Sequence, residues 1–160
     1  MKILVLSDSH GRDQYLAAIV YNHLDCDIII HLGDGEHDFD LIRDLPEMQK
    51  KRIIQVRGNC DFNSDLPITS FENIGPYRFY LTHGYQQHVK YGTDYLRLDA
   101  EKFHCQVALF GHTHHPVEDY KDGVYLFNPG AVCNGRYGII ELVGEDILFR
   151  HATLEKMDTF

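Results

Sequence analysis

The chain has 160 residues, 44% of them hydrophobic and 12% aromatic, so we expect one folded domain over residues 1–160 that buries a sizeable core. Its formal net charge is −9, with 15 basic and 24 acidic side chains and no basic stripe, which argues against a nonspecific nucleic-acid binder. The longest uninterrupted apolar run covers only residues 16–21 and no signal-peptide cleavage pattern follows the apolar start, so we expect a cytoplasmic protein without a membrane segment.

The first part of the chain alternates short apolar runs with amphipathic patterns. Strands are predicted where aliphatic residues run together, and helices where apolar residues recur every three or four positions. The predicted order is strand 2–7, helix 12–24, strand 27–32, a short helix through residues 39–45 that stops before Pro46, and strand 52–56. This β-α-β-α-β order predicts a parallel sheet whose strands end at a common edge.

The second part of the chain is richer in strands. The pattern predicts strands over 68–74 and 77–82 around a turn at Gly75-Pro76, a helix over 94–103, and strands over 106–110, 117–121, 123–127, 137–143 and 147–152. Asp122-Gly123 and Gly144-Glu145 separate the last strands and are typical hairpin turns. An α/β part followed by a β-rich part indicates two mixed sheets packed face to face, with the helices outside.

Residues that can bind metal ions follow the predicted strands at five places. The motifs are Asp8-Ser9-His10, Gly33-Asp34, Gly58-Asn59-Cys60-Asp61, His83-Gly84 and Gly111-His112-Thr113-His114. At the strand ends of one sheet, the carboxylates of Asp8 and Asp34, the amide of Asn59 and four imidazoles can converge. Such ligands suit hard and borderline divalent ions, and two such ions are a common means of hydrolysing phosphate esters. The sequence therefore predicts a binuclear metallohydrolase.

The spacing within the motifs indicates how ions would be shared. Asp8 and His10 lie two residues apart beyond a strand, as His112 and His114 do, so each pair can chelate one ion from the same side. The alternative, in which Asp8 caps a helix that starts near residue 12, is a poor helix-cap arrangement. Asp34 lies between two glycines and can be approached from both sides, which suits a bridging carboxylate with one oxygen for each ion. Without the other motifs, Asp34 would be an ordinary turn residue.

The other histidines carry no comparable pattern. His23 lies on an apolar helix stripe and His31 inside a strand, so we expect both to be hydrogen-bonded core residues. His37 and His115 are adjacent to the metal loops, where they could support a ligand or touch the substrate. The remaining three have no ligand partner at a useful spacing.

The four cysteines are widely separated and include no C-x-x-C pair. This spacing argues against both a disulfide framework and a zinc finger. Cys26 and Cys105 lie beside predicted strands, and we expect them to be buried thiols.

The order of the five motifs, D-x-H, G-D, G-N-x-D, H-G and G-H-x-H, resembles the calcineurin-like metallophosphoesterase superfamily. The resemblance covers residues 2 to about 134 and includes Asn128-Pro129-Gly130-Ala131, which is similar to the family's late N-P-G loop. The compact length and Cys60 in the third motif are similar to its small, single-domain YfcE-like phosphodiesterases. The resemblance implies a four-layer αββα sandwich of two mixed β-sheets flanked by helices.

The resemblance also implies a ligand set for two divalent ions. The first ion would take Asp8, His10, Asp34 and His114, and the second would take Asp34, Asn59, His83 and His112. We expect Mn²⁺ first, with Mg²⁺, Fe, Ni²⁺ or Zn²⁺ as alternatives, and a hydroxide between the ions that attacks a small phosphodiester. Few residues remain to form a cap over the site, so an open site is expected, with specificity broad or set by a partner in a homo-oligomer.

The third motif carries the predicted catalytic residues, Asn59, Cys60 and Asp61. The amide of Asn59 can donate a hydrogen bond to a phosphoryl oxygen. Cys60 stands where most of the superfamily has a histidine, and a thiol with an ordinary pKa of about 8.5 carries no positive charge to replace an imidazolium. Asp61, without that imidazole to hold, would orient Asn59 or a ligand histidine.

Two other functions are compatible with the same fold. One is a non-catalytic scaffold similar to the retromer scaffold subunit, in which the metal ligands are eroded, whereas every ligand type is present in this chain. The other is a phosphomonoesterase or protein phosphatase, which Cys60 and the lack of obvious insertions for a peptide groove disfavour. Metal content and turnover of an activated aryl phosphodiester would separate an enzyme from a scaffold.

Overall fold

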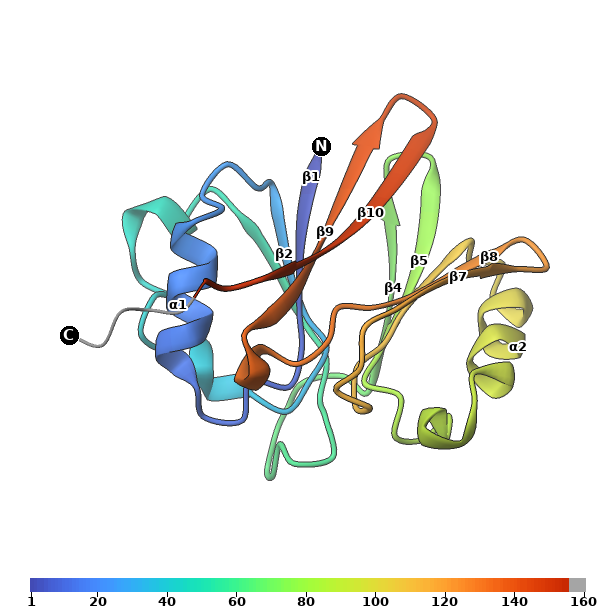
Figure 1. Cartoon of the computed structure of the whole chain (residues 1–160), viewed down its shortest axis with the longest axis horizontal. Coiled ribbons are helices and arrows are strands. Elements are labelled where there is room, and N and C mark those ends of the chain that lie inside the picture. Colours follow the sequence, from blue (N-terminus) through green and yellow to red (C-terminus); the bar gives the residue numbers. More distant parts are fainter. Residues whose placement is uncertain (156–160) are drawn as a thin grey trace.

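Two five-stranded sheets lie face to face between two helices in the computed structural model, which describes residues 1–155 (Figure 1). From edge to edge, the first sheet consists of β10 (Asp146–Thr153), β9 (Arg136–Val143), β1 (Lys2–Leu6), β2 (Ile28–His31) and β3 (Arg52–Gln55). The second consists of β4 (Thr69–Ile74), β5 (Tyr77–Thr82), β6 (Val107–Leu109), β8 (Val124–Asn128) and β7 (Val117–Lys121).

Both sheets are mixed, as the sequence predicts. In the first sheet β1, β2 and β3 run parallel, and β9 pairs antiparallel with both β1 and β10. In the second sheet β5, β6 and β8 run parallel, and the edge strands β4 and β7 are antiparallel to their neighbours. The five motifs follow β1, β2 and β3 of the first sheet and β5 and β6 of the second, so they meet at the strand ends of two sheets and not, as expected, of one. All five strands are parallel to a neighbour and place these loops at their carboxyl ends.

The four layers follow from the alternation of side chains along the strands. In β1, Ile3 and Val5 belong to the core between the two sheets, where Phe79 of β5 also packs. Leu4 and Leu6 face the other way and pack with the apolar face of α1 (Asp13–Tyr21). Because successive residues are buried on both faces, β1 reads as an unbroken apolar run.

The second helix covers the outer face of the second sheet (Figure 1). Helix α2 (Asp94–Lys102) buries Leu96 and Ala100 against Tyr80 of β5 and Ala108 of β6. The predicted αββα arrangement is therefore confirmed. In residues 1–155, no helix has the length and apolarity needed to span a bilayer.

The predicted helix over residues 39–45 is wrong. The connection from β2 to β3 instead holds two short 3₁₀ segments, η1 (Glu36–Phe39) and η2 (Pro46–Met48). Phe39 and Ile42 are buried as the apolar pattern indicates, but their segment closes through bonds between residues three apart, such as the Ile42 N–H to the Phe39 carbonyl. The Asp38 carboxylate accepts hydrogen bonds from Ser9 and Gly11 and so ties this segment to the loop after β1.

Smaller differences lie at element ends and in loops. Helix α1 stops at Tyr21 rather than residue 24, because the His23 N–H bonds the Val20 carbonyl and tightens the last turn. Two further 3₁₀ segments, η3 (Val89–Tyr91) and η4 (Val132–Asn134), have no predicted counterpart. Cys26 and Cys105 are buried free thiols, as expected.

Candidate metal centre

The loops after β1 and β6 bring together a first group of donor atoms. Oδ1 of Asp8 lies 3.5 Å from Nε2 of His10 and 3.2 Å from Nε2 of His114. The two imidazole nitrogens are 3.3 Å apart. We call Asp8, His10 and His114 the first donor cluster.

The loops after β2, β5 and β6 bring together a second group. Oδ2 of Asp34 lies 3.2 Å from Nε2 of His83, and the rings of His83 and His112 have centroids 5.0 Å apart. In each cluster all three donor atoms lie within 4.8 Å of one another. We call Asp34, His83 and His112 the second donor cluster. His112 and His114 therefore lie in different clusters, which differs from the expectation that this pair chelates one ion.

A single oxygen of Asp34 faces both clusters. Its Oδ2 lies 3.6 Å from Nε2 of His10 and 3.2 Å from Nε2 of His83. Its Oδ1 instead accepts the backbone N–H of Cys60 at 2.8 Å. Oδ2 is therefore the oxygen nearer to both clusters, whereas Oδ1 already accepts one hydrogen bond from the third loop, and the arrangement with one Asp34 oxygen for each ion stays a prediction.

Two buried atoms at this site have no hydrogen-bond partner within residues 1–155, namely Oδ1 of Asp8 and Nε2 of His83. The other oxygen of Asp8 accepts hydrogen bonds from the Ser7 hydroxyl at 2.6 Å and the His112 N–H at 3.0 Å. Leaving such polar atoms buried and unpaired costs free energy. A donor set of carboxylate oxygens and imidazole nitrogens suits divalent cations, so these residues fit metal ions.

Hydrogen bonding sets the direction in which the second donor cluster points. Nδ1 of His83 lies 2.7 Å from the Leu32 carbonyl, which can only accept, so Nδ1 carries the proton and Nε2 is left for a ligand role. Burial alone would raise the pKa of Asp34, but the imidazole of His83, whose Nε2 lies 3.2 Å from Oδ2, outweighs burial together with the Cys60 N–H and the charge of His10, and the pKa falls to about 2. Asp34 is therefore ionised at neutral pH.

The two histidines of the second donor cluster differ in their pKa. Burial alone would lower the pKa of His83, yet the Asp34 carboxylate 3.2 Å from its Nε2 and the charge of Asp8 raise it. Burial lowers the pKa of His112, and the neighbouring His83 lowers it further. A proton and a metal ion therefore compete for His83, whereas the pKa of His112 favours the neutral ligand form.

Five of the donor residues adopt backbone conformations that favour glycine. The φ angles are 55° at Asp8, 46° at His10, 63° at Asp34, 70° at His112 and 64° at His114. The left-handed region costs an ordinary L-residue on the order of 1 kcal/mol, and such residues gather at functional sites. The side chains converge only because the backbone turns sharply at each strand end.

Two glycines let the loops approach the carboxylates. A Cβ at Gly58 would lie 2.1 Å from Oδ1 of Asp34, and one at Gly111 would lie 2.7 Å from Oδ2 of Asp8. No side chain fits at either position without moving a donor. The glycines before Asn59 and His112 in the motifs are thus explained by close packing.

Asp61 holds two loops together through their backbone. Its carboxylate accepts four N–H groups, from Asp34 at 2.8 Å, Gly35 at 3.0 Å, Glu36 at 3.2 Å and Gly58 at 2.8 Å. We expected Asp61 to orient Asn59 or a ligand histidine, and the structure differs, because its hydrogen bonds go to backbone groups. Asp61 fixes the loop of Asp34 against the loop of Asn59.

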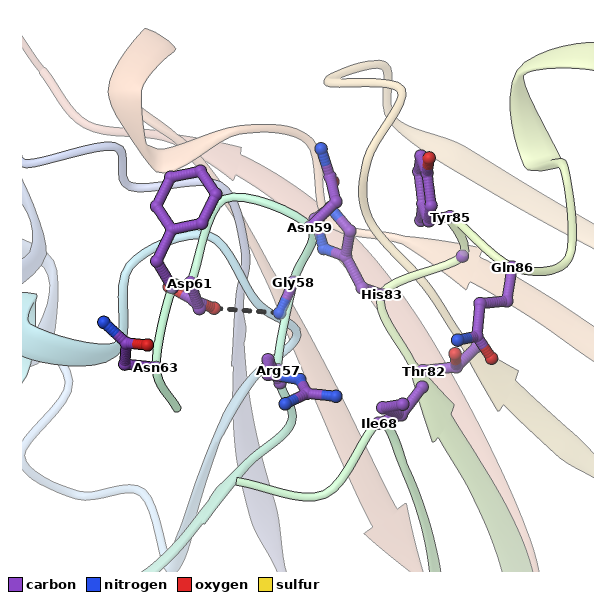
Figure 2. A pocket seen from close by; sticks show the side chains of 12 residues that line it. Arg57, Gly58, Asn59, Asp61, Asn63, Ile68, Thr82, His83, Tyr85 and Gln86 are labelled. Atoms are coloured by element: carbon purple, nitrogen blue, oxygen red, sulfur yellow. Dashed lines mark hydrogen bonds between the residues drawn. The ribbon is translucent and has the colours of Figure 1, made fainter. Parts of the chain in front are cut away.

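Asn59 and Cys60 lie at the open side of the site. Asn59 is exposed, lies beside His83 (Figure 2), and its Nδ2 is 3.6 Å from Sγ of Cys60. Sγ of Cys60 also lies within 4.8 Å of donor atoms of His10 and Asp34. Desolvation raises the pKa of this thiol and the charge of Asp34 raises it further, so Cys60 is protonated at neutral pH.

A buried chain of hydrogen bonds lies behind the donors, and the sequence did not reveal it. The Gly33 N–H donates to Nδ1 of His31, whose Nε2 lies 3.0 Å from the Ser9 hydroxyl. Ser9 donates to Asp38 at 2.5 Å, and Asp38 also accepts the Gly11 N–H. His31 is a hydrogen-bonded core residue as predicted, but it also ties the loop after β1 to the loop after β2. The one feature of the sequence that could have indicated this chain of hydrogen bonds was Ser9, which lies between two candidate ligands.

This chain of bonds makes stability depend on pH. Complete burial lowers the pKa of His31 from 6.5 to about 4, although Asp8, Asp61 and Asp38 act in the opposite direction. As the pH falls below 6.5, the unfolded chain takes up a proton that the folded chain refuses until about pH 4. His31 should therefore remove roughly 2 kcal/mol from the free energy of unfolding between pH 6.5 and 5. Urea denaturation of the metal-free protein at several pH values measures this loss.

The comparison that isolates His31 uses two variants. His31→Gln keeps a donor near Ser9 but removes the titration, so its stability should fall less over the same pH range. His37→Gln removes an exposed imidazole and should keep the wild-type slope. Equal slopes in wild type and His31→Gln would contradict this account.

The two histidines expected near the site differ in position. His37 lines a hollow of about 240 Å³ with His10, Asp34 and Cys60, and its Nδ1 lies 3.6 Å from Asp40. His115 lies in the loop after β6, where its backbone N–H bonds the Thr113 hydroxyl. His37 is therefore the one placed on a path to the donors.

Comparisons with known proteins place this geometry in a known family. Residues 1–144 match the profile of the calcineurin-like phosphoesterase superfamily domain. Phosphodiesterase YfcE of Escherichia coli K12 is 33% identical over 154 residues, covering 82% of this chain and 79% of that protein.

Solved structures share the fold. A predicted phosphoesterase from Streptococcus pneumoniae aligns with a TM-score of 0.79 at 24% identity, over 95% of this chain and 88% of its own. Vps29 of Entamoeba histolytica, solved with Zn²⁺, aligns with a TM-score of 0.76 at 17% identity, over 96% and 99%.

Proposed function

Because the chain belongs to the calcineurin-like phosphoesterase superfamily, we propose that it is a metal-dependent phosphodiesterase that hydrolyses small phosphodiesters at the two donor clusters. The observation that carries this proposal is the pair of buried, unpartnered atoms, Oδ1 of Asp8 and Nε2 of His83, at clusters that share Asp34. The relative YfcE is a phosphodiesterase, which supports a diester as the substrate.

The two clusters and Asn59 would hold two divalent ions. In this proposal the first ion takes Asp8, His10, Asp34 and His114, and the second takes Asp34, Asn59, His83 and His112. When bound, such ions neutralise phosphoryl charge and lower the pKa of water, which makes hydroxide available near neutral pH. Mn²⁺ is our first choice, because two carboxylates, an amide and imidazoles form a donor set between hard and borderline.

The chain's own groups would orient the substrate. The amide of Asn59 is exposed beside His83, where its N–H can donate to a nonbridging phosphoryl oxygen. Cys60 offers a protonated thiol, a weak donor without charge. Asp61 is engaged by backbone N–H groups, so no charged general acid stands in this loop. The arrangement favours diesters whose leaving group departs without help.

The proposal is tested with bis(p-nitrophenyl) phosphate. Protein stripped with EDTA and dialysed should not turn this diester over, and added Mn²⁺ should restore turnover, with two metal equivalents by elemental analysis. The monoester p-nitrophenyl phosphate serves as the comparison and should react more slowly. Turnover that persists in the chelator would overturn the metal mechanism.

A non-catalytic scaffold is the second candidate, because Vps29 shares the fold over nearly the whole chain. The same assay separates the two, since a scaffold of this kind would bind metal without hydrolysing either ester. Faster turnover of the monoester would instead favour a phosphomonoesterase.

A further inference from the structure

A pocket of about 410 Å³ opens beside the second donor cluster (Figure 2). It is lined by the loop after β3 and the loop after β5, and we call it the Arg57 pocket after the cation that it contains. His83 lines this pocket and belongs to the second donor cluster, and Asn59 lines the pocket beside it. Its volume lies in the range of small-molecule sites, about 300–1,000 Å³. A diester at the donors would therefore extend one ester arm into it.

Within residues 1–155, Arg57 is a cation without an anionic partner. Its Nη1 donates to the Ser64 carbonyl at 3.2 Å, and it forms no ion pair with any residue in the described range 1–155. Asp61 also lines the pocket, but its oxygens accept four backbone N–H groups. A guanidinium has five N–H groups in a planar fork that matches a phosphate or carboxylate. In a chain of net charge −9, an available arginine beside the donors indicates an anion that comes with the substrate.

Aromatic rings are exposed along the same pocket. Phe62 is 80% exposed and Tyr85 is 58% exposed, and both line it. The Tyr85 ring packs edge-on to His112 with centroids 5.5 Å apart, which holds it beside the donors. Ile68 adds an apolar side chain (Figure 2). Rings of this kind pack well against another planar ring.

We infer that the Arg57 pocket binds one ester arm of the substrate and favours an arm with a ring and a second anionic group, which Arg57 binds. The inference rests on the proposed function, because the position of the arm follows from the scissile phosphate at the donor clusters. The pocket would therefore favour a nucleotide-like phosphodiester that carries an additional phosphate or carboxylate over a phosphodiester whose arm is neutral.

Two substrates that differ only in that anion provide the test. Thymidine 5′-(p-nitrophenyl phosphate) and its 3′-phosphorylated form share nucleoside and leaving group. Wild type should prefer the phosphorylated form in kcat/KM by about 10-fold, mainly through KM, as expected for a charge-assisted hydrogen bond. In Arg57→Gln this ratio should fall to about 1, and Arg57→Lys should keep part of it because it keeps the charge but not the fork. The ratio cancels any general loss of activity.

Arg150→Gln is the matched control, since it removes an exposed arginine on β10 and should leave the ratio as in wild type. Calorimetry with thymidine 3′,5′-bisphosphate in EDTA gives a readout that needs no turnover, and Arg57→Gln should weaken this binding by about 10-fold. If wild type hydrolyses neither diester, the proposed function is wrong, but calorimetry still tests whether the Arg57 pocket binds the second anionic group. Equal kcat/KM for the two diesters in wild type, or an undiminished ratio or affinity in both Arg57 variants, would overturn the inference.

Discussion

Replacing Asp34 by asparagine is expected to remove both metal ions together and to lower turnover of an aryl phosphodiester by about 10³-fold. This factor corresponds to the several kcal/mol by which the bound ions would stabilise charge in the transition state. The reason is the position of Oδ2, which lies 3.6 Å from Nε2 of His10 and 3.2 Å from Nε2 of His83. In Asp34→Asn the amide oxygen can still accept the Cys60 N–H, so an NH₂ group, which cannot ligate, occupies the Oδ2 position.

The comparison for this prediction is His10→Ala. His10 belongs to the first donor cluster, so its loss should leave about one equivalent of metal bound at the second. Elemental analysis after dialysis against Mn²⁺ measures both variants. Two bound equivalents with wild-type turnover in Asp34→Asn would show that Asp34 is not shared.

The Cys60→His variant is expected to hydrolyse diesters with poor leaving groups tens of times faster than wild type. Activated aryl diesters should react at nearly the wild-type rate. General acid catalysis is worth about 10²–10⁴-fold when the acid is well positioned. Only part of that gain is available here, because Asp61 already accepts four backbone N–H groups and cannot also hold the new imidazole. The thiol in wild type carries no charge at neutral pH.

The measurement is a series of diesters with leaving groups of graded pKa. Wild type should show a steep dependence of kcat/KM on leaving-group pKa, and Cys60→His a shallower one. Cys60→Ser keeps the size and neutrality of the side chain, so its slope should match wild type. Parallel slopes for all three proteins would mean that position 60 does not protonate the leaving group.

Much of the fold was predictable because the inner strands β1, β2 and β6 are short apolar runs. The residues of β1 are apolar on both faces, since Ile3 and Leu4 enter different cores, and such runs are readily predicted as buried strands. The connection from β2 to β3 was not predictable in the same way. Its apolar spacing resembles a helix, but the hydrogen bonds of Asp38 to Ser9 and Gly11 decide its conformation, and these join segments far apart in the sequence.

For the candidate site, the sequence predicted which residues converge but not how each atom is used. Convergence follows from topology, because every motif ends a parallel strand. The separate tasks of the two Asp34 oxygens and the backbone contacts of Asp61 depend on how neighbouring loops meet. No spacing along the chain encodes those contacts. The sequence does not single out Arg57 for the same reason, because its lack of an ionic partner among residues 1–155 is a property of the folded loop.

The left-handed backbone at five donor residues has an evolutionary consequence. At each of these positions glycine would relieve on the order of 1 kcal/mol of conformational cost, while the donor would be lost. Ion binding and conformational stability therefore oppose each other in these loops. If the proposed function holds, substitutions that lose these donors would stabilise the fold, so a descendant without the activity could keep the sandwich, gain stability and serve a purely structural role.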